Sequence, residues 1–334
     1  MHPIERVLRR AGYFLRRRDL IEAGFDDNAI RAALAEHRIF RVRHGWYSVP
    51  DAPPAGVHAV RVGGRLTALS ALESYGIRVP RRDIIQVAVV RTACRLRSAA
   101  DRSQRLERSD GVRVHWIDRR ETGGSSWRVS LDDALLAVLS DESRDVSVAC
   151  ASALLRYAGF DMSRLGAVFA RAPARCLGWL ELVSERDDSH GETFLRLWLR
   201  DAGVPCAQQA RIRGVGRIDF RVGRRTFVEV NGGQHDPDWT GDGPNTWEDD
   251  HDRDTTVTIG GGAVLRYTYR QLYTDWPRVL AAIQRAVADD AIIAAYRARH
   301  PYRPRALRKR RTSAETRRRT TSPGPPSDEF PSFS

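Results

Sequence analysis

GRIDFRVGRRTFVEVNGGQH, residues 216–235, contains two strand-like runs joined by a turn, and each run carries one acid among apolar residues. A three-residue turn pairs Val222 with Thr226. The same register places Asp219 opposite Glu229, with their β-carbons about 4.5–5.5 Å apart on one face of the sheet. Two like charges directly opposite each other destabilise a sheet, so we expect a cation to neutralise the pair.

Three arrangements can relieve the repulsion between the two carboxylates. A divalent metal ion can take both carboxylates as hard oxygen ligands, and Mg²⁺ is typically held by one or two of them together with phosphate oxygens and water. An arginine can neutralise the pair instead, and Arg217 and Arg221 lie on the same strand as Asp219. In a bulged register, Asp219 lies on the opposite face of the sheet and the two charges no longer meet.

The residues on both sides of the hairpin extend it to a larger pattern. SHGETFLRLWLRDAG (189–203) has the apolar stripe of a helix, with Glu192 in its first turn, where the helix dipole alone favours an acid. QQARIRG (208–214) predicts a further strand. A helix at 248–258, a strand at 264–269 and a terminal helix follow. This order is compatible with an α/β core that exposes acids at one edge of its sheet.

The ordered motifs resemble the PD-(D/E)XK nuclease superfamily, most closely the short endonuclease-like domains related to very-short-patch-repair enzymes. The resemblance covers residues 186–298 and implies an αβββαβ restriction-endonuclease-like core. The matching residues occur in the order of that group: Glu192, Ile218-Asp219, Glu229 to Gly232 followed by His235, Asp250 to Asp254, and VLRYT at 264–268.

This resemblance implies a metal site and a reaction. Asp219 and Glu229 would hold Mg²⁺ (or Mn²⁺), Glu192 would support them from the helix, and His235 would act as the base. The implied activity is that of a metal-dependent DNA endonuclease, which hydrolyses phosphodiesters in defence or repair. No small-molecule cofactor is expected.

Two features depart from the superfamily. Its lysine position, two residues after the second acid, is Asn231, and the chain's sole lysine is Lys309, outside the domain. Asparagine can neither act as a base nor contribute positive charge, whereas His235 titrates near neutrality and can take the base role. The repair-type relatives carry Asp where Asn231 stands, so we expect weaker metal binding.

The helix at 248–258 has two interpretations. Asp250, Arg253 and Asp254 lie at i, i+3 and i+4, so an ion pair within the helix explains them as well as a function does. Arg253 is also a candidate DNA contact.

Residues 1–55 contain a second pattern. RRDLIEAGF (17–25) and DDNAIRAALAEH (26–37) predict two short helices, and IFRVRHGWYSV (39–49) predicts a hairpin. Helix, turn, helix and hairpin is the order of a winged helix-turn-helix.

Arginines flank every element of this pattern. In such domains, side chains at helix ends and in the wing contact phosphates, while a few exposed side chains read bases. Arg31 is the best candidate for reading bases, and Arg38, Arg41 and Arg43 are further candidate DNA contacts. Small bundles of this kind also serve as protein contacts or as folding caps.

The stretch RRRDLIEAGFDDNAIRAALAEHRIFRVRHGWYSVP (16–50) resembles the N-terminal winged-helix domain of AbiEi-like type IV antitoxins. The resemblance implies binding to promoter DNA, repression of the chain's own operon, and a cognate toxin as partner.

The middle of the chain, residues 60–185, predicts a mixed α/β domain of unknown role, with helices that include 131–140 and 174–184. No catalytic constellation occurs in it. His115 lies in an apolar strand, where a single histidine is most often a packed core residue.

Composition sets the outer limits. A chain of 334 residues with 42% apolar content predicts two or three domains with real cores. The formal net charge of +13 favours a polyanionic partner such as nucleic acid. The four cysteines are too widely spaced for a zinc site, and the sequence contains no apolar run long enough to span a membrane. We therefore expect a cytoplasmic protein with no membrane partner.

Residues 299–334 predict a disordered basic tail, because they are rich in Pro, Ser, Thr and Arg and lack apolar periodicity. The tail is either a tether for polyphosphate or a solvated terminus.

Two functions are consistent with these patterns. One is a metal-dependent DNA endonuclease targeted by a winged helix. The other is a non-catalytic, antitoxin-like transcriptional regulator of a type IV toxin–antitoxin system, whose nuclease-type domain binds DNA or a partner.

Overall fold

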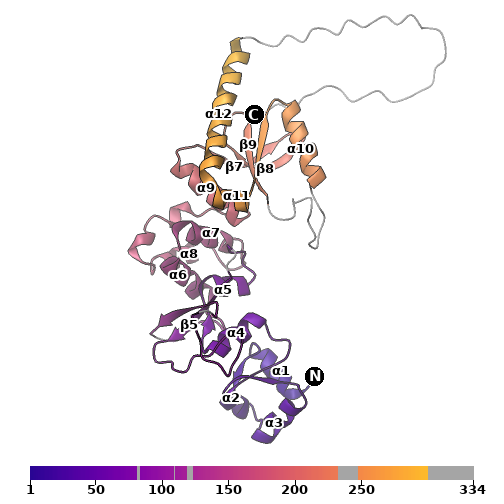
Figure 1. The fold of residues 1–334 in the computed structure, drawn as a ribbon, viewed down its shortest axis with the longest axis vertical. Coiled ribbons are helices and arrows are strands. Elements are labelled where there is room, and N and C mark those ends of the chain that lie inside the picture. The colour runs from indigo at the N-terminus through magenta and orange to yellow at the C-terminus, as the bar shows by residue number, and fades with distance from the viewer. Residues whose placement is uncertain (81–82, 109, 119–122, 232–246, 300–334) are drawn as a thin grey trace, which may run out of the picture. The chain divides into compact units, whose positions relative to one another are not determined.

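The computed structural model describes residues 1–80, 83–108, 110–118, 123–231 and 247–299. The chain divides into two compact units, Met1–Phe194 and a second unit that begins at Leu195, drawn as ribbons in Figure 1. Both units combine helices with small β-sheets, so the architecture is mixed α/β. Within the described ranges, every helix is too short or too polar to cross a membrane.

The first unit begins with three helices and a three-stranded antiparallel sheet. The elements are α1 (Pro3–Arg10), β1 (Leu15–Arg16), α2 (Arg17–Glu22), α3 (Asp27–Ala35), β2 (Phe40–Arg43) and β3 (Trp46–Ser48). The strand order β1-β3-β2 leaves β2 at an edge. The Asp26 side chain begins α3 because it accepts a hydrogen bond from the backbone N–H of Ala29. The predicted helices and hairpin are observed, and α1 and β1 are additions to them.

A second sheet follows in the same unit. Its elements are α4 (Pro54–Val62), β4 (Arg65–Leu66), α5 (Ala68–Ser74), β5 (Ile85–Val90) and β6 (Val112–Ile117). The strand order is β4-β5-β6, with β5 and β6 parallel. Gly64 allows β4 to approach β5 closely, since a Cβ at this position would lie 2.2 Å from the carbonyl oxygen of Ala88.

Helices complete the first unit. They are α6 (Leu131–Asp141), α7 (Arg144–Leu154) and α8 (Met162–Phe169), followed by the 3-10 turns η1 (Ala174–Cys176) and η2 (Leu180–Leu182). The prediction of one helix over 174–184 is wrong. Gly178 adopts a left-handed backbone with φ of 80°, which interrupts the segment and leaves two separate turns.

The second unit contains a four-stranded sheet with helices on both faces. Its elements are α9 (His190–Asp201, which crosses the boundary between the units), β7 (Ala207–Ile212), β8 (Gly216–Arg221), β9 (Thr226–Asn231), α10 (Trp247–Ile259), β10 (Ala263–Thr268), α11 (Tyr269–Thr274) and α12 (Trp276–Arg299). The strand order is β10-β9-β8-β7, with β10 parallel to β9 and the other neighbours antiparallel. The predicted order of helix, three strands, helix, strand and terminal helix is therefore observed.

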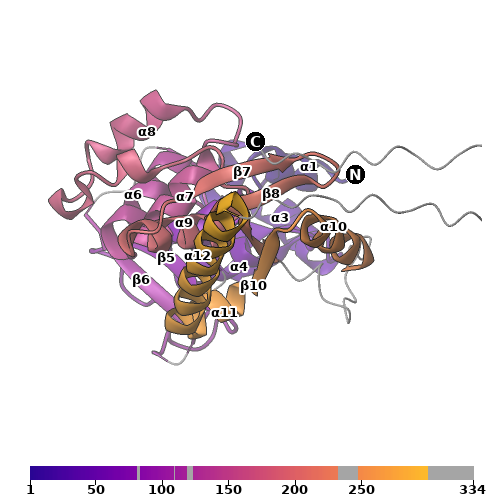
Figure 2. The same cartoon turned by 90° about the horizontal axis from the view of Figure 1, so that it is seen from above.

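Two apolar clusters lie on the two faces of this sheet. One joins Leu195 and Leu199 of α9 to β8, β9, α11 and α12. The other contains Ile218, Phe227 and, from α10, Val257. Figures 1 and 2 accordingly show α12 and α10 on opposite sides of the sheet. The strands that carry Asp219 and Glu229 are thus central and covered on both faces.

Candidate functional site

The hairpin of β8 and β9 positions the two acids. Phe220 pairs with Val228, and the backbone N–H of Val222 donates to the carbonyl oxygen of Thr226 at 3.0 Å. These contacts confirm the predicted pairing of Val222 with Thr226, whereas the predicted pairing of Asp219 with Glu229 stays a prediction. Asp219 lies one residue beyond the pair Phe220–Val228.

The strand β8 is irregular at Asp219. Residues two apart in a regular strand face the same side of the sheet. Ile218 nevertheless belongs to the cluster beneath α10, and Phe220 belongs to the cluster beneath α9 and α12. The carboxylate of Asp219 accepts a hydrogen bond from the backbone N–H of Val230, with 2.9 Å between Oδ2 and N. One oxygen of Asp219 therefore bonds to the backbone of the neighbouring strand.

Glu229 is a buried carboxylate, with 7% of the residue exposed. Its Oε2 forms an ion pair with Nη1 of Arg266, and its Oε1 lies 3.4 Å from Nη2 of Arg253. Arg266 is the register partner of Glu229 on the parallel strand β10, and Arg253 projects from α10. A buried charge needs such partners, because removal from water is costly. Both carboxylate oxygens of Glu229 thus contact guanidinium groups from outside the hairpin.

The same two arginines fasten α10 and β10 to the site. Arg266 donates two hydrogen bonds of 2.8 Å to the carboxylate of Asp254, and its Nη1 lies 3.4 Å from Oδ1 of Asn231. Arg253 donates through Nε to the carbonyl oxygen of Val215 at 3.1 Å. Arg253 and Asp254, which the sequence places on one helix face with Asp250, both bond to the sheet.

Sequence reasoning missed Arg266 as a site residue. The available signal was an arginine in the middle of the apolar strand AVLRYT. A charged side chain in such a strand requires a buried partner.

The donor atoms of the two acids suit a hard metal ion. Asp219 and Glu229 provide carboxylate oxygens, the donor type that Mg²⁺ prefers. A metal ion bound by Glu229 would share the carboxylate oxygens with the guanidinium groups of Arg253 and Arg266 or displace one of them. Among the described residues, no group of three or more His, Cys, Asp and Glu side chains is placed to hold a metal. His235 and the side chain of Asp250 lie outside the described residues, so the metal site and its base stay predictions.

Glu192 has a local role at the start of α9. Its Oε2 accepts a hydrogen bond from the backbone N–H of Asp188, and its own N–H donates to Oγ of Ser189, both at 3.1 Å. These contacts satisfy backbone groups at the N-terminus of the helix. Glu192 belongs to the first unit, and its predicted support of the acids in the second unit stays a prediction.

The candidate DNA contacts of the first unit are spread over α3 and β2. Arg31 is exposed on α3, where its Nη2 donates to Oδ1 of Asn28 at 2.8 Å. Arg38 is exposed just beyond the helix, and its Nε lies 3.7 Å from a carboxylate oxygen of Glu36. Arg41 is exposed on β2, and its guanidinium lies 5.8 Å from the ring centroid of Tyr47. The three arginines are thus open to solvent.

Arg43 is only half-buried and packs against α4. A Cβ at Gly63 would lie 2.0 Å from its Nη1, and its Nη2 lies 3.5 Å from the carbonyl oxygen of Arg95. Burial lowers the pKa of Arg43, and the charge of Arg97 lowers it further. This arginine therefore joins the hairpin of β2 and β3 to α4 and to the segment at Arg95, while part of its side chain is exposed.

His115 was interpreted as a packed core residue, and its side chain is 10% exposed. Its Nδ1 lies 2.6 Å from Oδ2 of Asp141. Burial lowers the pKa of His115, although Asp141 opposes this effect.

Comparisons with known proteins add little to this geometry. No family model matches the chain, and no curated protein matches it. Among solved structures, the catalytic domain of the homing endonuclease I-Bth0305I is 20% identical, with a TM-score of 0.25; the alignment covers 30% of this chain and 95% of that chain. A similarity of this size carries no argument, so the proposals below rest on the chain's own geometry.

Proposed function

We propose that the chain is a DNA-binding protein whose first fifty residues form a winged helix-turn-helix. The observation that carries the proposal is the element order α1-β1-α2-α3-β2-β3 with the sheet order β1-β3-β2. In this arrangement α3 is the recognition helix, and the turn between β2 and β3 is the wing. The net charge of +13 supports a polyanionic partner.

Arg31 is the base-reading residue of this proposal. Ile30 and Ala33 bury the inner face of α3, whereas Arg31 is exposed. Its hydrogen bond to Asn28 restricts the guanidinium. Arginine reads guanine through two parallel hydrogen bonds in the major groove. Arg38, Arg41 and the exposed part of Arg43 are then phosphate contacts.

The experiment that tests DNA binding uses duplexes from the chain's own upstream region. Fluorescence anisotropy at several salt concentrations is expected to show tighter binding than to a shuffled duplex of the same length. The logarithm of the association constant should fall linearly with the logarithm of salt. Equal, salt-insensitive affinity for both duplexes excludes the proposal.

We further propose that the second unit is a metal-dependent endonuclease of the PD-(D/E)XK type. Its support is that Asp219 and Glu229 lie on adjacent central strands, within the element order of helix, three strands, helix and strand. In this role Asp219 and Glu229 hold Mg²⁺ or Mn²⁺, Glu192 supports them, and His235 accepts the proton of the attacking water. When bound, the ion would supply charge stabilisation of the phosphate and a lowered pKa for water. In this role Arg253 contacts DNA phosphate.

The contacts of Glu229 favour a second candidate function. Because Arg253 and Arg266 already neutralise this carboxylate, the site can be stable without a metal. The chain is then a non-catalytic, antitoxin-like regulator of a type IV toxin–antitoxin system, and its second unit binds DNA or a cognate toxin.

A plasmid assay separates the two candidates. Nicking of supercoiled DNA that needs Mg²⁺ or Mn²⁺, and that is lost in both Asp219→Ala and Glu229→Ala, supports the endonuclease. Specific DNA binding without nicking in either metal supports the regulator. Nicking that persists in both variants comes from a contaminant and also removes the endonuclease proposal.

A further inference from the structure

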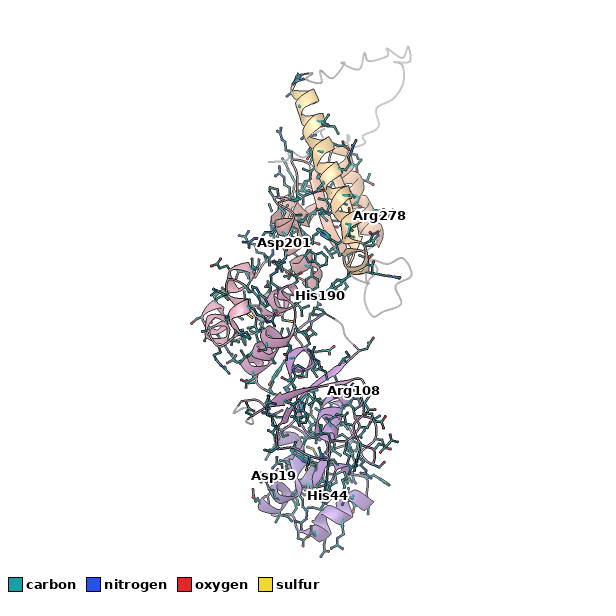
Figure 3. All side chains as sticks on the ribbon, turned by 60° about the vertical axis from the view of Figure 1, so that its left-hand side comes forward. Asp19, His44, Arg108, His190, Asp201 and Arg278 are labelled. Atoms are coloured by element: carbon teal, nitrogen blue, oxygen red, sulfur yellow. The ribbon has the colours of Figure 1, made fainter. Side chains whose placement is uncertain are left out.

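We propose that the loop between β5 and β6 forms, together with the edge strand β2, a second surface that grips the phosphate backbone of DNA. This surface consists of the wing-edge arginines, defined as Arg41, Arg43, Arg95, Arg97, Arg102 and Arg105. The proposal rests on the proposed DNA binding by α3 and the wing, and it extends the contact into the following domain. In Figure 3, His44 lies in the turn between β2 and β3, and Arg108 lies in the later part of the β5–β6 loop.

Hydrogen bonds fasten this loop to the hairpin of β2 and β3. Nη1 of Arg102 donates to the carbonyl oxygen of Arg41 at 2.6 Å, and Nη2 of Arg43 lies 3.5 Å from the carbonyl oxygen of Arg95. β2 is an edge strand of its sheet, so its open side is free to receive the loop. The loop therefore has a defined position beside the wing.

A third arginine holds the same loop from α4. Nη1 of Arg61 donates to the carbonyl oxygens of Ala99 and Ala100, at 2.8 and 2.7 Å. Three arginines thus use backbone carbonyls as partners and keep their positive charge.

The six wing-edge arginines gather positive charge on one loop and one strand. Among the described residues, none of the six forms an ion pair with a carboxylate. Asp101 lies in the same loop. Hydrogen bonds from N and Oγ of Ser103 lower its pKa most, and the charges of Arg61 and Arg102 lower it further, so its carboxylate offsets part of the positive charge. The charge of Arg97 lowers the pKa of Arg43, and that of Arg102 lowers the pKa of Arg61, in both cases after the larger effect of burial.

Such mutual repulsion is relieved when a polyanion binds. Arg41, Arg95, Arg102 and Arg105 are exposed, and Arg43 and Arg97 are half-buried. Duplex DNA is the partner that this position favours, because Arg41 lies on the wing strand itself and so continues the surface that α3 presents. In the described part of the loop, 91–108 and 110–111, no helix is present to enter a groove, so the contact is to phosphates and does not depend on sequence.

The test is a double variant, Arg95→Gln with Arg105→Gln. Both side chains are exposed and, within the described part of the chain, form no hydrogen bond or ion pair. The matched control is Arg278→Gln with Arg285→Gln, which removes the same charge from exposed positions on α12. Near-identical thermal unfolding of all three proteins verifies that the substitutions leave the fold intact.

Fluorescence anisotropy gives the salt dependence of binding to an upstream duplex of about 30 base pairs. Each lost phosphate contact makes the slope of log K against log salt shallower by about 0.9. The test variant lacks two contacts, so its slope should be shallower than that of wild type by about 1.8. Its affinity should fall by the same factor on specific and shuffled duplexes. On a duplex trimmed to the segment that α3 and the wing cover, wild type and test variant should bind equally.

Other outcomes overturn the inference in distinguishable ways. A slope that stays at the wild-type value in the test variant, while Arg31→Ala still weakens specific binding, removes the second surface and leaves the winged-helix proposal standing. If the test variant binds single-stranded RNA more weakly than wild type does but binds duplex DNA equally well, the surface belongs to another partner and the inference is also overturned. Absence of salt-sensitive DNA binding by the wild-type protein removes both proposals.

Discussion

Glu229 and Arg266 are register partners on the parallel strands β9 and β10, and their charged groups form an ion pair inside the second unit. Their side chains are 9% and 18% exposed. Arg266 also bonds to Asp254, so one guanidinium connects both strands to α10. The acid that the sequence singles out is therefore part of a structural network as well as a candidate metal ligand.

Arg266→Ala is expected to destabilise the second unit, because it removes the guanidinium that forms an ion pair with Oε2 of the buried Glu229. Removal of one member of a buried pair costs about 3–5 kcal/mol, and the residual exposure and Arg253 reduce this to about 2–3 kcal/mol. Urea unfolding measures the loss, with Arg270→Ala as an exposed control on α11. In a Glu229→Gln background, the same substitution should lower the free energy of unfolding by a smaller amount. Equal costs in both backgrounds contradict the coupling.

The sequence predicted the hairpin that contains the acids but not their partners. A three-residue turn sets the pairing of Val222 with Thr226, so the register of β8 and β9 follows from local residues. The contact of Glu229 with Arg266 depends on β10 pairing in parallel with β9 after an intervening helix. No local pattern specifies that pairing. The irregularity at Asp219 cannot be seen in the sequence, because two apolar residues two positions apart, Ile218 and Phe220, are also what a regular strand would show, although in the structure they lie in different clusters.

The same limit applies to the first unit. Apolar periodicity and turn residues revealed α2, α3 and the hairpin, but the two-residue strand β1 is too short to leave a pattern. The β5–β6 loop reaches β2 through contacts between residues about fifty to sixty positions apart, such as Arg102 with Arg41. Its arginine content was visible in the sequence, whereas its position beside the wing required the tertiary structure.

Arg266→Gln also tests the proposed metal site. If Asp219 and Glu229 hold a divalent ion, Arg266 competes with it for Glu229, so removal of the positive charge should tighten Mn²⁺ binding. Isothermal titration calorimetry is expected to show a lower Kd for Mn²⁺ than in wild type, and Asp219→Asn should abolish binding in both backgrounds. Mn²⁺ binding that is absent, or that is indifferent to Asp219→Asn, removes the two acids as ligands.

Arg31→Ala is expected to weaken binding to the upstream duplex by about 1–3 kcal/mol, because a lost bidentate contact to guanine costs this much. Discrimination against the shuffled duplex should fall with it. Arg285→Ala removes another exposed arginine, on α12, and serves as the control. A loss of the same size on both duplexes would reassign Arg31 to the phosphate backbone.

The first unit should lose stability as the pH falls below about 6.5, the ordinary pKa of histidine. Burial lowers the pKa of His58, His115 and His190 in the folded state. Below 6.5 the unfolded chain therefore binds more protons than the folded one, and stability falls until the lower folded pKa values are passed. Asp27, Asp51 and Asp101, whose pKa values lie below 3.8, remain charged in this window. The midpoints of urea unfolding at pH 7.5, 6.5 and 5.5 measure the effect. In His115→Gln, the midpoint should change less with pH than it does in wild type. A midpoint that rises on acidification contradicts it.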